Sequence, residues 1–437
     1  MTDKVNVREL VIGVLLSVTK DGEYSHIALK NTLDKYQYLE KQERSFLTRV
    51  CQGTLENMIW IDYCINQFST VKVNKMKPII RTILRSSVYE LRFMDSVPES
   101  ATVNEAVKLA EKKGFRNLKG FVNGVLRNIS RNLTNIKLPD PAADLTGYLS
   151  VRYSMPEWIA EELLGQYGAE QTEQILAAFL TDMPTGIRFN PARISREELT
   201  KRLTEEGALV QEIAEVPCGL FISGYDHLES LPSFRQGLFY VQDISSMQVA
   251  LNSGVKEGDH VLDVCAAPGG KSIHMAELLN GTGMVEARDL TPGKVALIRE
   301  NIERVGLTNI RAACADARKL RHEDEETADI VIADLPCSGL GVIGKKADIK
   351  YKITPQKQKE LVLLQREILN VVSRYVKAGG TLMYSTCTIN REENEENVRW
   401  FLQEHKDFYL ENEKLLLPRA GWQDGFYLAR IKKEEHE

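Results

Sequence analysis

Residues 261–272 read Val-Leu-Asp-Val-Cys-Ala-Ala-Pro-Gly-Gly-Lys-Ser, an apolar run prone to form a β-strand followed by a sharp, glycine-rich turn. Two later stretches follow the same pattern, Ala-Asp-Leu-Pro-Cys-Ser-Gly at 333–339 and Tyr-Ser-Thr-Cys-Thr at 384–388. From residue 239 onward, strand-like runs alternate with helical patterns, which predicts a parallel α/β sheet with right-handed crossovers. Ligands of such sheets bind beyond the carboxyl ends of the strands, so the three turns are expected to share one site.

The turn at 266–271 is typical of a nucleotide-like cofactor site, because its glycines let a ligand approach backbone N–H groups at a helix start. It lacks the Gly-x-Gly-x-x-Gly fingerprint and the spacing of an ATP-binding P-loop, so NAD and ATP are disfavoured. Asp289 follows the second strand, where a carboxylate can bind ribose hydroxyls. Asp316 follows the third, where it can accept a hydrogen bond from an adenine amino group. A single acid at a strand end is usually a helix cap, but with Asp334 there are three.

The seven cysteines are scattered, with no Cys-x-x-Cys pair and no histidine cluster. This argues against a disulfide framework and against a bound metal, and it favours a reducing cytoplasm. Cys51, Cys64 and Cys314 are expected to be small buried hydrophobic side chains. Cys337 and Cys387 differ, because each follows an apolar strand in a polar turn where the thiol would face the cleft. A reactive thiol there needs its thiolate stabilised or generated on demand.

Residues 5–131 show helical spacing of apolar side chains throughout and predict an all-α domain, with helices at 7–18, 41–68, 77–94, 103–113 and 119–132. The net charge of the whole chain is −5, but residues 72–131 contain 13 Lys and Arg against 5 Asp and Glu, a net charge of +8. Such a segment is either a footprint for nucleic-acid phosphates or the solvated basic face of a helical domain.

The sequence predicts four regions. A helical domain at 1–134 precedes a linker at 135–147, which contains Pro139-Asp140-Pro141. A small α+β region at 148–240 could guide single-stranded RNA or serve as a structural insert, and an α/β domain occupies 241–437. The N-terminus lacks the pattern of a signal peptide, and no apolar run approaches the roughly 20 residues of a membrane span. We therefore expect a cytoplasmic protein with no membrane partner; nothing in the sequence demands more than a monomer.

The helical region resembles the NusB family of antitermination factors. The resemblance is clearest at Arg-Thr-Ile-Leu-Arg-Ser-Ser-Val-Tyr-Glu-Leu (81–91), Val-Asn-Glu-Ala-Val-Lys-Leu-Ala (103–110) and Gly-Phe-Val-Asn-Gly-Val-Leu-Arg-Asn (120–128). That family binds RNA, so the resemblance implies that the basic segment faces RNA. The candidates to contact phosphates are Arg81, Arg85, Lys112, Lys113, Arg116 and Lys119.

The C-terminal 200 or so residues resemble RNA cytosine-5 methyltransferases of the Sun type. Besides the three turns, the resemblance rests on Phe-Tyr-Val-Gln-Asp-Ile-Ser-Ser at 239–246 and Glu-Glu-Asn-Glu-Glu-Asn-Val at 392–398. Together with the NusB-like region it covers nearly the whole chain and points to the bacterial 16S rRNA cytosine-5 methyltransferases of the Sun/Fmu type. It implies S-adenosyl-L-methionine as methyl donor and 16S rRNA, before full subunit assembly, as substrate.

The resemblance also assigns roles to residues. Cys387 is implied to be the nucleophile that adds to carbon 6 of the cytosine, and Cys337 to assist product release. Asp334 is implied to contact ring N3 and the exocyclic amine, where charge develops. The implied cofactor contacts are Cys265, Ala266, Ala267, Pro268, Gly269, Gly270, Lys271, Asp289, Asp316 and Asp334.

Two stretches depart from the family pattern. Residues 344–350 read Gly-Lys-Lys-Ala-Asp-Ile-Lys, where relatives place an arginine and a proline before Asp-Ile, in a loop expected to face RNA. Residues 287–290 read Ala-Arg-Asp-Leu, so a charged side chain precedes the predicted ribose carboxylate. The departures leave the catalytic trio intact.

Four other readings compete with this one. A DNA cytosine-5 methyltransferase would use Cys337 as nucleophile, but the Ser-Thr-Cys motif and the NusB-like domain disfavour it. A non-catalytic RNA-binding factor would have no need of Asp334 and both cysteines at strand ends. A nicotinamide dehydrogenase is disfavoured by the missing glycine fingerprint. A cytosine-5 methyltransferase acting on another RNA stays open.

Overall fold

The chain divides into two units in the computed structural model, which describes residues 5–435. The first unit contains the residues up to Leu180 together with the short segment Ile343–Lys352. The second contains Thr181–Val342 and the residues from Ile353 onward. None of the helices between residues 5 and 435 is both long and apolar enough to cross a membrane.

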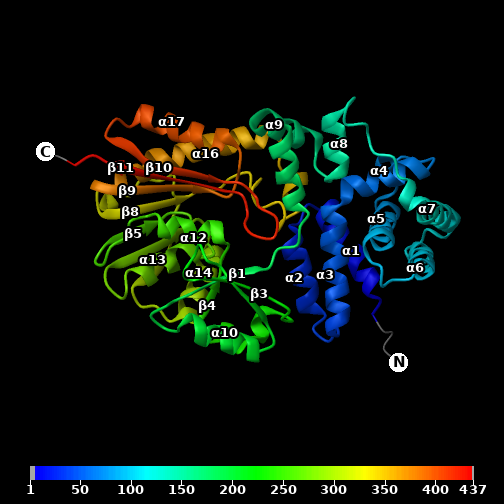
Figure 1. Ribbon diagram of the computed structural model, residues 1–437, viewed down its shortest axis with the longest axis horizontal. Coiled ribbons are helices and arrows are strands. Elements are labelled where there is room, and N and C mark those ends of the chain that lie inside the picture. Colours follow the sequence, from blue (N-terminus) through cyan, green and yellow to red (C-terminus); the bar gives the residue numbers. More distant parts are fainter. Residues whose placement is uncertain (1–4, 436–437) are drawn as a thin grey trace. The chain divides into compact units, whose positions relative to one another are not determined.

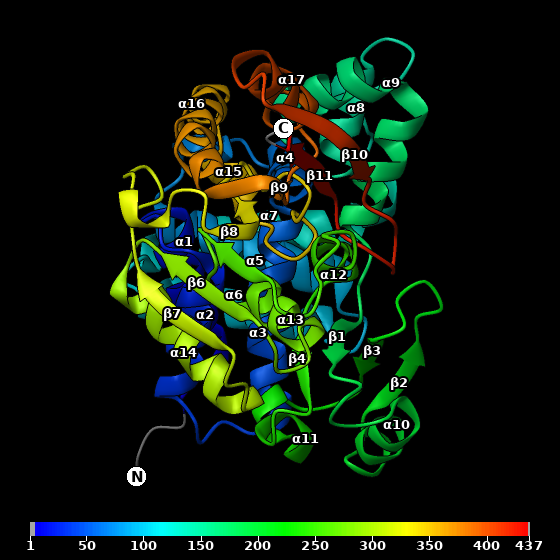
Figure 2. The ribbon, with the colours of Figure 1, turned by 90° about the vertical axis from the view of Figure 1, so that its left-hand side faces the viewer.

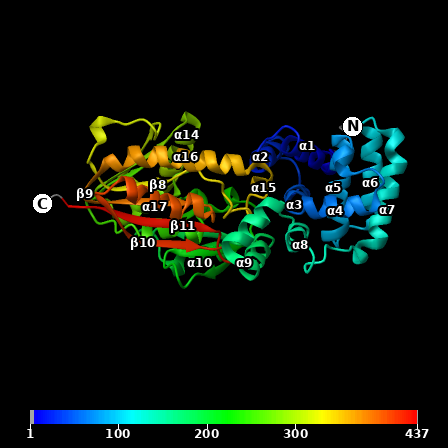
Figure 3. The ribbon, with the colours of Figure 1, turned by 90° about the horizontal axis from the view of Figure 1, so that it is seen from above.

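The first unit is helical, and its N-terminal helices pack around one apolar core (Figure 3). Its helices are α1 (Val7–Thr19), α2 (Ser25–Lys35), α3 (Lys41–Glu56), α4 (Met58–Phe68), α5 (Pro78–Phe93), α6 (Glu99–Lys112), α7 (Lys119–Asn132), α8 (Leu145–Arg152) and α9 (Glu157–Phe179). Pro78 begins α5, at a position whose N–H group would have no partner within the helix. The predicted all-α N-terminal domain is confirmed.

The helix boundaries differ from the prediction at several points. The helix predicted at 41–68 is two helices, because Asn57 leaves the helical conformation between α3 and α4. The pattern also missed α2, which buries only Ala28 and Leu29 and so has a weak apolar stripe. The predicted linker at 135–147 already contains the start of α8, which the Asp144 side chain caps through the Gly147 N–H group.

Two charged side chains of the segment Ile343–Lys352 are buried within the helical unit, whereas Lys345 and Lys346 are exposed, so an RNA-facing loop at 344–350 stays a prediction. Asp348 is 1% exposed and accepts hydrogen bonds from the backbone N–H and hydroxyl of Ser25. Lys350 is 2% exposed and donates to the backbone carbonyl of Glu56 at 2.7 Å. Burial lowers the pKa of Lys350 to about 7. These side chains anchor the segment and are not presented to a nucleic acid.

The second unit begins with a small antiparallel sheet of order β2-β3-β1-β4 (Figure 2). The strands are β1 (Thr185–Phe189), β2 (Leu209–Glu212), β3 (Gly219–Ser223) and β4 (Phe239–Val241). Helix α10 (Arg196–Glu205) packs its buried Leu199 and Leu203 into the same apolar core as this sheet. The Ser195 hydroxyl caps the start of α10 by accepting a hydrogen bond from the Glu198 N–H group.

A seven-stranded sheet of order β10-β11-β9-β8-β5-β6-β7 forms the rest of the second unit (Figure 1). Its strands are β5 (His260–Asp263), β6 (Met284–Asp289), β7 (Ile310–Cys314), β8 (Ala328–Asp334), β9 (Val376–Thr386), β10 (Phe408–Leu416) and β11 (Phe426–Lys433). Strands β5 to β9 pair in parallel, and β11 and β10 complete the sheet as an antiparallel hairpin.

Helices cover both faces of this sheet, which is the layered arrangement that a mostly parallel sheet requires. They are α12 (Ile244–Leu251), α13 (Gly270–Leu278) and α14 (Pro292–Val305) on one face, and α16 (Pro355–Val372) and α17 (Glu395–Glu404) on the other (Figure 1). The predicted architecture is confirmed: a helical domain, a small α+β region and a Rossmann-like α/β domain. Three of the parallel strands end on an aspartate, namely Asp263, Asp289 and Asp334.

Candidate active site

Asp334, the last residue of β8, connects two of the three predicted turns. Its Oδ2 accepts a hydrogen bond from Lys271 Nζ at 2.7 Å, and its Oδ1 accepts one from Ser385 Oγ at 2.8 Å. Lys271 belongs to the first turn of α13, and Ser385 lies two residues before Cys387. Burial alone would lower the pKa of Lys271, but the Asp334 carboxylate beside it raises that pKa above its usual value. The turn after β5 and the turn after β9 therefore meet at one carboxylate.

The two cysteines of the remaining turns are brought together. Cys337 Sγ and Cys387 Sγ lie 3.3 Å apart, both thiols are free, and both side chains are partly exposed. The hydrogen bond to Cys387 raises the pKa of Cys337 well above its usual value, and burial and the Glu393 and Asp334 carboxylates act in the same direction. The raised pKa favours the protonated form of Cys337, and either thiol can be the donor in the contact between the two sulfurs. Of the other cysteines predicted to be buried, Cys51 and Cys64 are buried, but Cys314 is exposed.

The glycine-rich turn begins α13 without a side-chain cap. Gly269 stands at the N-cap position with φ of 106°, a conformation that disfavours any other residue. Its backbone carbonyls are held from the small sheet instead: Tyr240 Oη donates to the Pro268 carbonyl, and Arg188 Nη1 donates to the Gly270 carbonyl, each at 3.1 Å. Arg188 is fully buried on β1 and also pairs with Glu277 of α13 at 2.9 Å. The first N–H groups of a helix have no acceptor within the helix, and no side chain caps them at the start of α13, so they suit an anionic ligand.

The two other predicted cofactor acids lie at the ends of neighbouring strands. Asp289 is 3% exposed, and its carboxylate accepts hydrogen bonds from the backbone N–H groups of Ala267 and Leu290 at 3.0 and 2.7 Å. Asp289, the last residue of β6, therefore also holds the glycine-rich turn. Asp316 follows β7 and binds the guanidinium group of Arg318 at 3.0 and 2.8 Å. That hydrogen bond lowers the pKa of Asp316.

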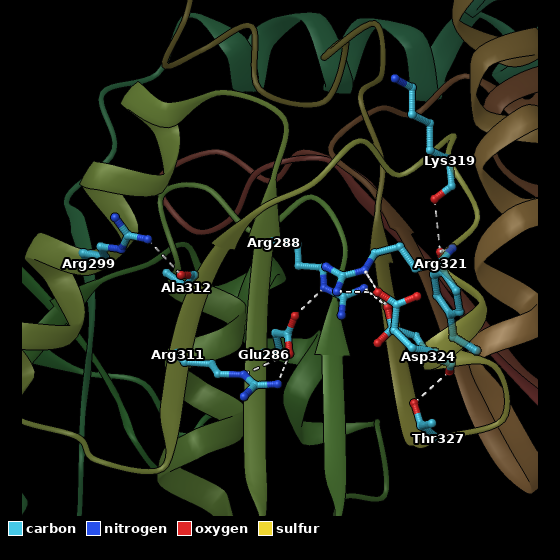
Figure 4. Close-up of polar contacts among 11 residues, drawn as sticks. Glu286, Arg288, Arg299, Arg311, Ala312, Lys319, Arg321, Asp324 and Thr327 are labelled. Atoms are coloured by element: carbon cyan, nitrogen blue, oxygen red, sulfur yellow. Dashed lines mark hydrogen bonds and ion pairs between the residues drawn. The ribbon is translucent and has the colours of Figure 1, made fainter.

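Arg288 is the charged residue that departs from the family pattern before Asp289. Two acidic side chains that lie away from the glycine-rich turn neutralise its charge (Figure 4). It is 5% exposed, and its guanidinium group binds Glu286 at 2.6 Å and Asp324 at 2.7 Å. Successive side chains of a strand point to opposite faces, so Arg288 and Glu286 share the face of β6 that Asp289 does not. The Arg288 side chain therefore does not obstruct the predicted ribose-binding carboxylate of Asp289.

The predicted RNA-contacting residues lie in the helical unit, and several already have carboxylate partners. Arg85 is 11% exposed and binds both carboxylate oxygens of Asp62 at 2.7 and 2.5 Å. Lys112 and Lys113 both bind Glu9 at 2.6 Å.

The other three candidates differ in exposure. Arg116 is 78% exposed and pairs with Glu111 at 3.0 Å, so its guanidinium group remains accessible. Arg81 has a buried Nε without a hydrogen-bond partner among the described residues, and burial lowers its pKa. Lys119 begins α7 on the surface. Phosphate contact by the six residues stays a prediction, and Arg85 is the least accessible of those whose exposure is known.

Three residues that support the site were missed by the sequence analysis. Tyr240 and Arg188 hold the glycine-rich turn, and Glu393, in the turn that precedes α17, contacts the turn of Cys337 through Ser338. One signal was present for Arg188: it stands in the otherwise apolar run Gly-Ile-Arg-Phe, where its side chain points inward. Glu393 lies in a run of acids that resembles a solvated helix start, so its burial could not be seen.

Among residues 5–435, no group of three or more His, Cys, Asp or Glu side chains is arranged to hold a metal ion. Three family models match the chain. They are the NusB family over residues 5–131, the ferredoxin-like domain of RsmF/B-like methyltransferases over residues 155–226, and the 16S rRNA methyltransferase RsmB/F family over residues 249–432.

Full-length relatives agree with these matches. The chain is 37% identical over 451 residues to a probable ribosomal RNA small subunit methyltransferase B of Bacillus subtilis (strain 168), covering 99% of each chain. It is 28% identical over 442 residues to ribosomal RNA small subunit methyltransferase B of Escherichia coli O1:K1 / APEC, covering 99% and 100%. The crystal structure of PH0851 superposes with a TM-score of 0.82 at 28% identity, covering 98% and 99% of the two chains.

Proposed function

This chain belongs to the family of ribosomal RNA small subunit methyltransferases B, and from that premise we propose that it methylates carbon 5 of a specific cytosine in 16S rRNA. The methyl donor is S-adenosyl-L-methionine, and the reaction passes through a covalent bond between a cysteine and carbon 6 of the base. The observation that carries the proposal is the pair of thiols 3.3 Å apart beside a carboxylate that is held by Lys271 and Ser385.

The chemistry explains why two thiols and one acid are needed. Carbon 5 of cytosine is too weak a nucleophile to accept a methyl group unaided. When the Cys387 thiolate adds to carbon 6, the ring becomes an enamine whose carbon 5 attacks the sulfonium methyl group. S-Adenosyl-L-methionine supplies that methyl group and leaves as the neutral thioether. Transfer of the carbon 5 proton to a base, for which solvent water suffices, re-forms the double bond between carbons 5 and 6, breaks the bond between carbon 6 and sulfur, and regenerates the Cys387 thiolate.

The contacts of the two sulfurs favour Cys387 over Cys337 as the nucleophile. The raised pKa favours a protonated Cys337, whose thiol can donate to the Cys387 sulfur and stabilise negative charge there. Cys387 in turn contributes to the raised pKa of Lys271, an ammonium group that favours a thiolate nearby. Cys337 is thereby suited to assist product release rather than to attack.

Asp334 is suited to steady the base. Lys271 and Ser385 fix its two oxygens, so the carboxylate is preorganised and needs little rearrangement to meet ring N3 and the exocyclic amine. The cytosine must leave any stack to reach this position between a thiol and the methyl donor.

The residues at the strand ends fit the methyl donor. The left-handed Gly269 and the uncapped start of α13 provide free N–H groups, which suit the methionine carboxylate. Asp289 stands one strand away, at the place of a ribose-binding acid, and Asp316 one strand further, near an adenine. The proposed contacts are Cys265, Ala266, Ala267, Pro268, Gly269, Gly270, Lys271, Asp289, Asp316 and Asp334.

The helical region at 1–134 and the small α+β region at 148–240 are proposed to bind and guide the RNA, and the region at 241–437 to perform the transfer. The family match supports this division, since residues 5–131 match the NusB family. We propose that the enzyme acts in the cytoplasm as a monomer, on 16S rRNA before the subunit is fully assembled.

The decisive experiment maps 5-methylcytosine in 16S rRNA from cells with and without this protein, and in free rRNA incubated with the purified enzyme and labelled methyl donor. We expect one cytosine to lose its methyl group when the protein is absent and to regain it in vitro. Loss of the mark from another RNA, with 16S rRNA unchanged, would overturn the substrate; no 5-methylcytosine at all would overturn the reaction.

A further inference from the structure

Glu393 is a carboxylate buried beneath the turns that carry the two cysteines. It is 0% exposed. Its oxygens accept hydrogen bonds from the Ser338 backbone N–H at 2.9 Å, from the Ser338 hydroxyl, and from Gln365 Nε2 at 3.0 Å. Asn390 Nδ2 approaches at 3.5 Å. All of these donors are neutral, so the charge of the carboxylate is held by dipoles.

Its hydrogen bonds reach both cysteine turns. Ser338 directly follows Cys337, and the Ser338 hydroxyl lies 2.8 Å from the hydroxyl of Thr388. Thr388 directly follows Cys387. Glu393 thus stands at the end of a short chain of contacts that sets the spacing of the two sulfurs.

The carboxylate is itself held from the far side. Gln365 of α16 donates from the same Nε2 to Glu393 and to the carbonyl of Pro336, the residue before Cys337, at 2.8 Å. Asn397 of α17 donates to Gln365 Oε1 at 2.7 Å, and Tyr384 donates to the backbone carbonyl of Glu393. The carboxylate therefore cannot turn away without losing its bond to Gln365, whose side chain Asn397 of α17 holds in turn.

We propose that Glu393 is a positioning residue for the methyl transfer: through Ser338 and Thr388 it holds the turns of Cys337 and Cys387 so that the two sulfurs face each other and take unequal roles. The proposal rests on the proposed function, because it assigns the two thiols unequal roles in that reaction.

Burying the ionised carboxylate of Glu393 costs free energy that a neutral side chain at the same position would not cost. Burial raises its pKa, because removing a carboxylate from water disfavours the ionised form, and the hydrogen bonds from Ser338 oppose that effect. A glutamine would fill the same volume without this cost. What glutamine lacks is the negative charge, which is among the causes that raise the pKa of Cys337.

The test uses the full-length protein with Glu393→Gln, which removes the charge and keeps the shape. The matched control is Glu396→Gln, an exposed glutamate three residues away on α17. The first measurement needs no RNA: the rate of alkylation of Cys337 by iodoacetamide between pH 6 and pH 10, read peptide by peptide. We expect alkylation of Cys337 at pH 8 to be about five- to tenfold faster in Glu393→Gln than in the control, since a lowered pKa exposes more thiolate.

The second measurement follows methyl transfer to 16S rRNA. We expect Glu393→Gln to lower kcat about tenfold or more and to accumulate the covalent protein–RNA adduct, with the KM for S-adenosyl-L-methionine within twofold of the control. An unchanged alkylation profile of Cys337 overturns the proposal, whatever the activity, and so does an unchanged kcat. Wild-type protein that forms no 5-methylcytosine overturns the proposed function instead, while the alkylation profile still tests the effect on Cys337.

A second variant guards against misfolding. Ser338→Ala removes the hydroxyl that connects Glu393 to Thr388 in the Cys387 turn, but leaves the carboxylate bound to the backbone N–H of residue 338 and to Gln365. If Glu393→Gln does not fold, the same two measurements on Ser338→Ala decide the proposal, with the lower kcat and the accumulated adduct expected again. A Ser338→Ala protein that matches the control in kcat and adduct overturns it.

Discussion

The glycine-rich turn after β5 and the two cysteine turns after β8 and β9 meet in one site, but different side chains hold their backbones, and besides the acceptor Asp289 the first turn has donors on its carbonyls. The donors are Tyr240 and Arg188, from the small sheet, which bind the carbonyls of Pro268 and Gly270. The cysteine turns are held by an acceptor, the buried carboxylate of Glu393.

The difference follows from what each turn must present. Donors that occupy the carbonyls leave the N–H groups of a turn free for an anionic ligand. An acceptor that occupies an N–H group and a hydroxyl fixes the backbone beside a thiol and adds negative charge nearby. Cofactor affinity and thiol chemistry are therefore supported by separate sets of contacts, and substitutions should affect KM and kcat separately.

The largest effect is expected at the two thiols. Cys387→Ala removes the nucleophile and should lower methyl transfer by about 10⁴-fold or more, with the affinity for S-adenosyl-L-methionine unchanged. Cys337→Ala should also block turnover but should trap a covalent adduct with RNA, because attack proceeds and release does not. Denaturing gel electrophoresis with labelled rRNA distinguishes the two. An adduct that survives Cys387→Ala would show that the nucleophile is assigned to the wrong sulfur.

The next largest effect is expected at the carboxylate between the two regions. Asp334→Asn keeps an oxygen for the Ser385 hydroxyl but removes the ion pair with Lys271 and the charge that faces ring N3. We expect kcat to fall by about 10²- to 10³-fold, the range seen when one preorganised electrostatic contact is lost. Single-turnover methylation measures the loss, and calorimetry of cofactor binding supplies the comparison. A loss confined to cofactor affinity would place Asp334 with the glycine-rich turn alone.

The sequence predicted much of this site because its residues follow strands. A strand pattern places Asp289, Asp334, Cys337 and Cys387 at one edge of a parallel sheet, and the fold confirms that edge. What it could not show are contacts between distant parts of the chain. Ser338 and Glu393 are 55 residues apart, and no local pattern marks an acid that folds beneath a turn rather than into solvent.

The same reason explains why the sequence did not predict two buried charges within residues 344–350. Lysines and an aspartate in a loop read as solvent-exposed, but Asp348 and Lys350 find partners more than 290 residues away in the sequence. Buried charges of this kind depend on a specific partner, which only the three-dimensional structure identifies.

A third prediction concerns the buried carboxylate of Asp263, which lies beside the glycine-rich turn. Asp263 at the end of β5 is 1% exposed; Ser272 donates to its Oδ2, and its Oδ1 has no hydrogen-bond partner among residues 5–435. Burial raises its pKa to about 7. A raised acid pKa means that the folded state binds the proton more tightly than the unfolded state, whose pKa is about 3.9. The stability from Asp263 is thus complete below pH ~4 and is lost as pH rises through about 7.

Asp263→Asn removes this dependence. Relative to the variant, the wild-type protein should lose roughly 3 kcal/mol of unfolding free energy between pH 5 and pH 8. Urea unfolding of both proteins at the two pH values measures it, and differences between variants cancel the other titrating groups. An equal difference at both pH values would mean that Asp263 is ionised throughout, in which case its burial must be offset by charges near the glycine-rich turn.

The smallest effect is expected at Tyr240, and it tests the separation of the two regions most directly. Tyr240→Phe removes one hydrogen bond to the Pro268 carbonyl, which Asn301 Nδ2 still binds at 3.1 Å. The loss of one neutral hydrogen bond costs about 1 kcal/mol, so the KM for S-adenosyl-L-methionine should rise roughly fivefold. Because the cysteine turns are held by Glu393, kcat should stay within twofold. Tyr409→Phe, at an exposed tyrosine of β10, is the matched control. A lowered kcat with unchanged KM would show that the small sheet supports the cysteine turns as well. The glycine-rich turn and the cysteine turns would then not be held separately.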